Sequence, residues 1–556
     1  MFRTGKNQVS SRLNNPVAIT MPTGGRVAAK TRKSLSLAGF WLFCCLPMLA
    51  QGTADTLLLT NIGIWDGSSG EVRNDQHILI IAGEIVAIGP EKPPAPSGAQ
   101  VMDGTGHVAL GTITPGQIAN LVVFDANPQE DISILARADL HTQLLIKDGQ
   151  VIENYYENFR LPEPDYDDPD HVQARSIEAN NGWASFGFGG AAAIDAVELD
   201  LDDASQQQFG GAAENERAGV TAARLILSGH LGRSHPVNYY VDWGYNGFDE
   251  GFDINAEDDY TLYNLEFRFP ETRLGKLTVG RMKAPTTISR VWSGIYLPVS
   301  ARQAPVSALT RARDDGVRLT NTAFDKRMTW GIGVFNDWLT VGRDIGDTNT
   351  YVTGRVTGLV LDDQPEGHLL HVGIGFRWTD FVEETIRFRA KPGVPLVPDY
   401  LDTGDMPSDG ARWLTTEVAW RKKNLMLTAE HIRTDLDSPS IGNPTFTGSY
   451  VWLEWMLTGE TRSFNKEKAT FGRPIPFHDF SRGGNGLWSL GLAFNDTDLN
   501  EGLIDGGDMQ QVTIGINWYP QKSYRWGLEY GRMWLDRDGL DSTSEFLHLF
   551  FHVTNL

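Results

Sequence analysis

The chain has 556 residues, which is long enough for more than one domain. Its net charge of −22 at pH 7 excludes nucleic acid as a partner, because neutralising phosphates requires basic patches. The two cysteines are Cys44 and Cys45, so the chain beyond them can form no disulfide and no thiolate metal site.

Residues 1–54 have the layout of a secretory signal peptide. They hold seven Lys or Arg residues and no Asp or Glu. Their apolar run, Leu35–Ala50, is shorter than the roughly 20 residues that a membrane-spanning helix needs, and small residues follow it at Gly52–Ala54. We therefore expect an exported protein, with an N-terminal membrane anchor as the alternative.

Residues 55–160 alternate short apolar runs with turns. A hairpin is expected at His77–Gly89, and two further strands at Leu121–Phe124 and Leu144–Val151. Strands of this length packed around one apolar core predict a small β-sandwich-like lobe.

Two segments of this lobe, Val101–Val108 and Gly111–Pro128, resemble the amidohydrolase superfamily. In that family a β-sandwich flanks a metal-bearing barrel, and the two segments resemble the chain just before and just after the barrel. A barrel takes roughly 250 residues, whereas here only Ala109 and Leu110 separate the two segments in the sequence. His77, His107 and His141 stand apart, so the family's metal ligands have no counterpart. We predict a remnant without catalytic residues, metal ion or cofactor.

Residues 161–180 are rich in Pro and Asp, which predicts an extended linker between the lobe and the rest of the chain. Two alternative roles of the lobe stay open. It could form part of a metal-dependent amidohydrolase-like enzyme, cleaving C–N bonds while tethered to a membrane barrel. It could also serve a binding or structural barrel as a periplasmic plug or a docking module.

Residues 181–556 alternate apolar and polar residues with a period of two, as in Val237–Asn246 and Leu370–Trp378. Such runs recur without a helical segment to cover their apolar faces, which favours a transmembrane barrel over a soluble β-sandwich. Acidic, glycine-rich stretches, such as Asp249–Asp259 and Asn495–Asp508, are expected to separate the strands. Aromatic residues near strand ends suit interfacial girdles: Trp243, Tyr245, Trp378, Trp420, Trp455, Trp518 and Tyr519.

At roughly 22–25 residues for a strand and its connection, this length predicts about sixteen antiparallel strands. A barrel of that size encloses a water-filled lumen rather than a packed core. The predicted fold class is therefore all-β, with a sixteen-stranded transmembrane barrel over residues 181–556 and the small lobe before it.

Four segments of the barrel region carry a resemblance to the phosphate- and pyrophosphate-selective porin family. Leu277–Pro285 ends a strand with Lys and Pro, Leu297–Val317 looks like a folded-in loop with the next strand, Leu457–Arg462 follows a Trp-rich strand, and Ile514–Tyr519 alternates. The resemblance implies an outer-membrane homotrimer that contacts lipid and lets small anions, such as phosphate, diffuse passively.

The chain departs from that family pattern in two places. It ends in Leu556, where outer-membrane barrels usually end in an aromatic residue, although Phe546 and Phe550 lie on the same face of the last expected strand. Asp314 and Asp315 also follow an arginine directly, which places acid where the phosphate-selective members are strongly basic.

Cationic residues gather in the segment that resembles the constriction loop. Arg and Lys suit phosphate because they combine charge with hydrogen-bond donors. The alternative is that most of them are solvated loop charges paired with neighbouring Asp. The candidate anion-binding residues are Arg281, Lys283, Arg290, Arg302, Arg311, Arg313 and Arg318.

Overall fold

The computed structural model describes residues 56–65, 71–94, 99–125, 127–130, 133–136, 141–154, 177–179, 182–209, 216–245, 260–338, 348–363, 367–380, 385–477, 480 and 484–554. The predicted signal peptide, most of the predicted linker and the acidic stretch 249–259 lie outside these residues. Among the described residues, no helix has both the length and the apolar character needed to span a bilayer.

The N-terminal lobe is one hydrogen-bonded sheet in the order β3-β2-β1-β5-β6-β7-β8, with β4 paired beside β5 to the same strand. The sequence predicted a sandwich, but no second sheet is present in the described part of the lobe. Backbone bonds from Ala119 to Gly83 and from Gly149 to Ala119, both at 2.9 Å, draw the two ends of the sheet together around its apolar core. Its elements are β1 (Thr56–Trp65), β2 (Arg73–Ile81), β3 (Glu84–Gly89), β4 (Gln100–Asp103), β5 (Val108–Thr112), β6 (Asn120–Phe124), α1 (Ser133–Ala136), β7 (Thr142–Lys147) and β8 (Gln150–Asn154).

The rest of the described chain forms a closed antiparallel barrel of sixteen strands, which β10 and β31 close by pairing with each other. This confirms the predicted fold class and strand number. The strands are β10 (Ala184–Leu201), β11 (Glu216–Leu231), β12 (Val237–Tyr245), β13 (Tyr260–Arg268), β14 (Lys276–Met282), β15 (Asp314–Ala323), β16 (Met328–Asn336), β17 (Thr350–Asp363), β18 (His368–Asp380), β23 (Gly410–Lys422), β24 (Leu425–Asp437), β25 (Thr445–Met456), β28 (Leu487–Glu501), β29 (Ile504–Gln521), β30 (Tyr524–Arg537) and β31 (Leu540–Thr554).

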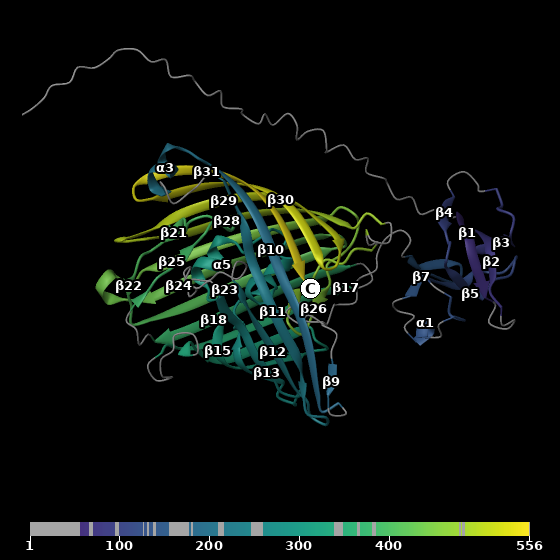
Figure 1. The fold of residues 1–556 in the computed structure, drawn as a ribbon, viewed down its shortest axis with the longest axis horizontal. Helices are drawn as coiled ribbons and strands as arrows, with labels where there is room; N and C mark the ends of the chain where they lie inside the picture. Colours follow the sequence, from purple (N-terminus) through teal and green to yellow (C-terminus); the bar gives the residue numbers. More distant parts are fainter. Residues whose placement is uncertain are drawn as a thin grey trace, which may run out of the picture. The chain divides into compact units, whose positions relative to one another are not determined.

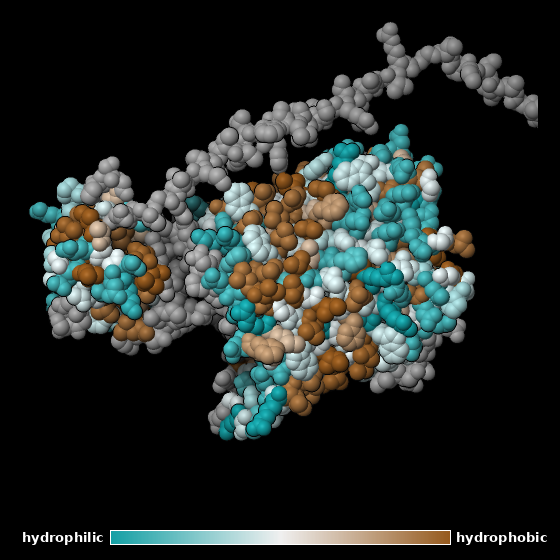
Figure 2. All heavy atoms as spheres, turned by 180° about the vertical axis from the view of Figure 1, so that it is seen from behind, coloured by the Kyte–Doolittle hydropathy of each residue, from teal (hydrophilic) through white to brown (hydrophobic). Residues whose placement is uncertain are grey.

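The predicted alternation sets the two faces of the wall. In β18, Ile374 and Trp378 point outward and are 50% and 43% exposed, whereas His371 and Arg377 point inward and are 0% and 4% exposed. Figure 2 shows hydrophobic side chains gathered over the middle of the barrel wall, as expected for a surface in contact with lipid. The girdle prediction is wrong for Tyr519, which is buried inside the barrel beside Arg525.

The two ends of the barrel differ in their connections (Figure 1). One end, the short-turn end, carries mostly tight turns and also holds the end of β31 and the short strand β9 (Ile177–Ala179), which pairs with β10. The predicted linker is therefore wrong at its last residues, which extend the sheet. The other end, the long-loop end, carries the longer connections, with helix α3 (Asp203–Phe209) and the 3-10 turn η5 (Pro439–Ile441) among them.

The acidic stretch Asn495–Asp508 forms the upper part of the hairpin β28–β29 instead of a loop. The hairpin turns only at Gly502, whose positive φ of 62° suits glycine. Leu499 and Met509 point into the barrel and are fully buried. The alternation of inward apolar and outward acidic residues therefore continues through this stretch and keeps the strands paired.

Three long connections fold back into the lumen, and we number them as inserts. Insert 1, residues 283–313, joins β14 to β15 and contains α4 (Ile288–Val291), η3 (Gly294–Tyr296) and α5 (Ala304–Leu309). Insert 2, residues 385–409 of the connection from β18 to β23, contains β19 (Thr385–Ile386), β20 (Arg389–Ala390), β21 (Leu401–Asp402) and β22 (Met406–Pro407). Insert 3, residues 457–486, joins β25 to β28 at the short-turn end and contains β26 (Phe464–Asn465) and β27 (Thr470–Phe471).

The inserts share one apolar cluster with inward residues of the wall. Trp292 of insert 1, for example, packs on Trp452 of β25 and on Phe471 of insert 3, with ring centroids 5.9 and 5.4 Å apart. The segment Leu457–Arg462 belongs to insert 3 and is not a strand, because β25 ends at Met456. The lumen therefore contains a partial core, which the barrel size alone did not predict.

Candidate functional site

Insert 1 crosses the lumen and is hydrogen-bonded to distant parts of the wall. The Ile288 N–H donates to Glu417 Oε2 of β23 and to Glu430 Oε1 of β24, each at 2.8 Å. The Ser300 N–H donates to Glu529 Oε1 of β30 at 2.6 Å. Because several strands separate these walls from β14 and β15, the bonds span the interior. The folded-in loop that the sequence predicted is thus confirmed.

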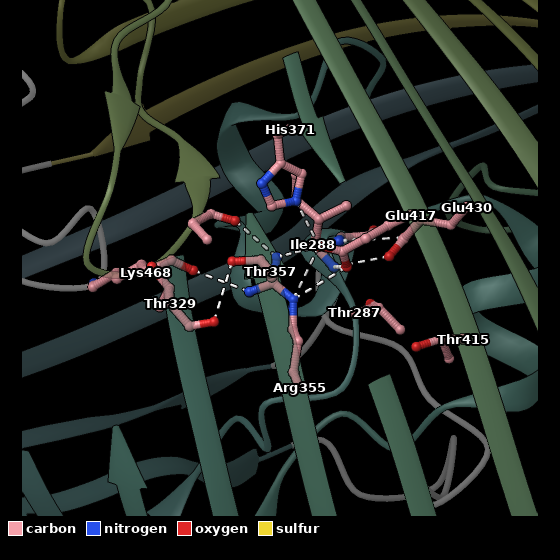
Figure 3. Close-up of polar contacts among 12 residues, drawn as sticks. Thr287, Ile288, Thr329, Arg355, Thr357, His371, Thr415, Glu417, Glu430 and Lys468 are labelled. Atoms are coloured by element: carbon pink, nitrogen blue, oxygen red, sulfur yellow. Dashed lines mark hydrogen bonds and ion pairs between the residues drawn. The ribbon is translucent and has the colours of Figure 1, made fainter. Parts of the chain in front are cut away.

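The wall side of this contact is a compact polar network (Figure 3). Arg355 of β17 donates to both Glu417 oxygens, at 2.6 Å from Nη2 to Oε1 and 3.1 Å from Nε to Oε2. His371 Nε2 lies 2.7 Å from Glu417 Oε1. Arg355 also donates to the carbonyls of Lys468 and Ala469, at 3.0 and 2.8 Å, so one guanidinium ties the wall to insert 3.

Five arginines form a belt in the lumen near the long-loop end, and each binds a partner on another element. We call Arg224, Arg281, Arg311, Arg313 and Arg377 the arginine belt. Four of them pair with aspartates, and the fifth donates to an amide oxygen. The contacts are Arg224–Asp242 at 3.1 Å, Arg281–Asp315 at 3.1 Å, Arg311–Asp314 at 2.7 Å, Arg377–Asp314 at 2.9 Å and Arg313 to Asn264 Oδ1 at 2.9 Å.

Arg290 and Arg302 hold insert 1 together from within. Arg290 donates to the carbonyls of Val306 and Thr310 at 3.0 and 2.9 Å, and Arg302 donates to the carbonyl of Ser289 at 2.6 Å. Both side chains are almost fully buried. Their guanidinium groups therefore bind backbone carbonyls inside the folded loop, where water does not reach them.

A cavity of about 590 Å³ opens beneath insert 1 at the short-turn end, between the turns of β11–β16 and insert 3. Six cationic and three acidic side chains line this cavity together with uncharged residues, and we call it the basic cavity. The cations are Arg268, Lys276, Lys283, Arg318, Arg355 and Lys468, and the acids are Glu266, Glu271 and Glu467. The lining thus has three more cationic than acidic side chains. The excess in the arginine belt is smaller, because its five arginines face Asp242, Asp314, Asp315 and, 3.6 Å from Arg311, Asp337.

The acids of the basic cavity are themselves bound by cations of the cavity or close to it. Arg268 donates to Glu266 Oε2 at 2.7 Å, and Glu467 of insert 3 accepts from Lys276 and from Lys326. The hydrogen bonds from Lys276 and Lys326 hold the pKa of Glu467 below its ordinary value. In the same insert, burial raises the pKa of Glu460.

The structure divides the seven predicted residues among three environments. Lys283 and Arg318 line the basic cavity, while Arg281, Arg311 and Arg313 belong to the arginine belt. The two that hold insert 1 internally are described above. An anion-binding role stays a prediction for all seven.

Sequence reasoning missed four cations of the basic cavity. Arg268 and Lys276 flank the β13–β14 turn, so their position at the base of a predicted hairpin could have indicated them. Arg355 and Lys468 gave no such signal, because Arg355 lies within β17 and Lys468 reaches the cavity only through the fold of insert 3. Among the described residues, no group of three or more His, Cys, Asp or Glu side chains could hold a metal ion.

A closed sixteen-stranded barrel with a loop across its lumen and an apolar outer wall defines the class: an outer-membrane porin. The sequence profile of the family described as phosphate-selective porin O and P matches residues 195–543. The chain belongs to this family, and its location is the bacterial outer membrane. The match leaves the N-terminal lobe outside, so the amidohydrolase resemblance receives no support from it.

One curated relative, an uncharacterized protein of Caulobacter vibrioides, is 27% identical over 166 residues, which is 29% of this chain and 33% of that protein. The match thus spans about a third of that relative's length. Among solved structures, OmpT of Vibrio cholerae is 12% identical with a TM-score of 0.42, covering 68% of this chain and 100% of that one. An anion-selective porin from Comamonas acidovorans is 14% identical with a TM-score of 0.41, covering 67% and 99%.

Proposed function

We propose that the protein is a passive channel that favours small anions, and that the basic cavity concentrates them. The observation that carries this is the excess of cationic over acidic side chains around a cavity of about 590 Å³. Fixed positive charge along a narrow, partly desolvated pathway attracts anions and repels cations. In outer-membrane barrels the short turns face the periplasm, so the cavity would lie at the periplasmic mouth.

Phosphate or pyrophosphate is the solute class that family membership suggests. The chemistry of the cavity suits it, since Arg268 and Arg318 offer planar guanidinium groups and Lys276 offers a compact charge. The arginine belt adds little to this proposal, because aspartates offset most of its charge.

Planar-bilayer recordings of the purified protein test the proposal. In a salt gradient we expect a reversal potential of the sign for anions, and added phosphate should reduce the chloride current. A reversal potential of the sign for cations would contradict the anion preference, and a chloride current indifferent to phosphate would contradict a phosphate site.

We also propose a homotrimer without enzymatic activity, metal ion or cofactor. Family membership supports the channel role and the trimer, and the native mass in detergent tests the assembly by comparison with one and three copies. For the lobe we keep the proposal of an amidohydrolase-type remnant, which rests on its sequence segments. Metal analysis of the intact protein should find no bound zinc, and stoichiometric zinc would favour the hydrolase alternative.

A further inference from the structure

Two wall glutamates hold insert 1 through the same backbone group. Glu417 and Glu430 both accept from the Ile288 N–H at 2.8 Å, so their nearest oxygens lie close to each other. Glu430 Oε2 also accepts from the Tyr450 hydroxyl at 2.6 Å and from the Ser289 N–H at 3.3 Å. The pair therefore fixes the start of α4 against β23 and β24.

The network around this pair holds one fixed cation for two carboxyl groups. The titratable and charged groups that face it are Arg355 of β17, His371 of β18 and Tyr450 of β25, all buried. Arg355 binds Glu417, whereas Glu430 meets only N–H and O–H groups among the described residues. Burying a second, uncompensated carboxylate there is costly.

Histidine does not supply the missing charge in this arrangement. His371 Nε2 is bonded to Glu417, but Nδ1 is buried and has no hydrogen-bond partner in the described chain. A protonated ring carries an N–H on both nitrogens, so it would bury an unsatisfied donor. The geometry favours the neutral ring with its proton on Nε2.

We propose that Glu417 and Glu430 share one proton and that this proton positions insert 1 in the lumen. When the proton leaves for the lumen water, two adjacent carboxylates face one guanidinium. They separate, one of them loses the Ile288 N–H, and insert 1 detaches from this wall. The inference rests on the channel role proposed above, but not on the anion preference.

A shift of insert 1 would change the lumen because this segment is packed on all sides. Of residues 281–315, only Val291, Ala301 and Arg311 are more than marginally exposed. The opposite wall holds the insert independently, through Glu529 and Ser300. We therefore expect loss of the proton to loosen one attachment and widen the passage, without unfolding the barrel.

The test is single-channel conductance of the full-length protein from about pH 5 to about pH 9. We expect a constant conductance at acid pH and a rise through a single-proton transition as the pH increases. Glu430→Gln, which cannot lose a proton at this position, should stay at the acid value throughout. The matched control is Glu501→Gln, at the exposed tip of the β28–β29 hairpin, which should keep the transition.

Tyr450→Phe keeps the carboxyl pair and removes one donor to Glu430. Because a hydrogen bond to the charged form favours that form, its loss should move the transition upward by about one pH unit. Heat-modifiable gel mobility checks that each barrel is folded. If Glu430→Gln does not fold, the Tyr450→Phe shift decides the question.

Three results would overturn the proposal: no transition in the wild type, an unchanged transition in Glu430→Gln, or an unshifted transition in Tyr450→Phe. A transition that survives in Glu430→Gln but disappears in His371→Gln would assign the proton to the histidine. Absence of channel steps at every pH would contradict the channel role itself, whereas steps without a transition contradict only the shared proton.

Discussion

The arginine belt and the basic cavity are both rich in cations, but their charges are compensated differently. In the belt, Asp242, Asp314 and Asp315 lie within 3.1 Å of arginines, and both members of each pair are almost fully buried. The basic cavity is lined by six cations and three carboxylates. One of the cations, Arg355, also binds Glu417, and the side chains of Lys276 and Arg318 are 45% and 20% exposed. A high density of arginine therefore does not by itself identify the anion site.

The difference follows from the position of each region in the barrel. The belt lies where insert 1 rejoins the wall. Its arginines pair with aspartates there, so the charges at this junction can be buried. The basic cavity lies below the insert, where water reaches Lys276 and Arg318, so their charges need not be matched one to one. We therefore assign a structural role to the belt and expect solute to bind in the cavity.

The largest expected effect is a loss of stability when the buried ion pair that holds insert 3 is removed. Insert 3 forms one wall of the basic cavity. Arg462 donates to Glu454 of β25 and to the carbonyl of Gly472, and it is fully buried. Arg462→Met should leave Glu454 uncompensated and cost about 3–5 kcal/mol of unfolding free energy. Urea denaturation followed by tryptophan fluorescence measures this loss.

The matched control for that variant is Arg433→Met. Arg433 also pairs with a carboxylate, Asp435, at 2.6 Å, but this pair is exposed on the barrel. We expect no measurable change in its urea midpoint. Equal losses in the two variants would show that burial does not distinguish the pairs.

A smaller effect is expected from Glu467, the carboxylate that Lys276 and Lys326 bind. Glu467→Gln should increase the preference for anions at neutral pH, because it removes one negative charge from the cavity. Since the pKa of Glu467 is lowered, its ion pairs persist above the ordinary carboxyl range and disappear as the pH falls through the lowered pKa.

The reversal potential of the wild type should therefore approach that of Glu467→Gln only at strongly acid pH. Glu501→Gln, with the same chemical change on the exposed hairpin tip, serves as the control and should behave as the wild type. If wild type and Glu467→Gln agree at neutral pH, Glu467 does not contribute to selectivity.

The smallest effect is expected from removing the N-terminal lobe. A variant lacking residues 56–154 should keep the wild-type conductance and reversal potential, because the described barrel closes through β10 and β31 without the lobe. A larger conductance in the shortened chain would favour a plug. The lobe would then affect conductance in addition to the belt and the cavity.

The sequence predicted the barrel well because its signal is local. Alternation in segments such as Leu370–Trp378 reports one strand at a time, and Lys283 with Pro285 marks the start of insert 1. The eight-stranded sheet of the lobe was mistaken for a sandwich, because alternation reveals which residues are buried but not which strands are bonded.

The site could be predicted only in part, because ion pairs depend on strand register. Arg281 and Asp315 are direct cross-strand neighbours, yet insert 1 separates them in the sequence, so their pairing could not be read from spacing. The sequence did show Asp314 and Asp315 next to Arg313, and in the structure both aspartates pair with arginines of the belt. Insert 3 was missed because its first residues follow a Trp-rich strand and resemble its continuation.

The most direct test of the central claim compares reversal potentials of two double variants in a salt gradient. Lys276→Gln with Arg318→Gln removes two charges from the basic cavity, whereas Arg281→Gln with Asp315→Asn removes one complete ion pair from the belt. We predict that the first shifts the reversal potential clearly toward cations and that the second leaves it unchanged. Loss of anion preference in the belt variant, with the cavity variant unaffected, would contradict the account.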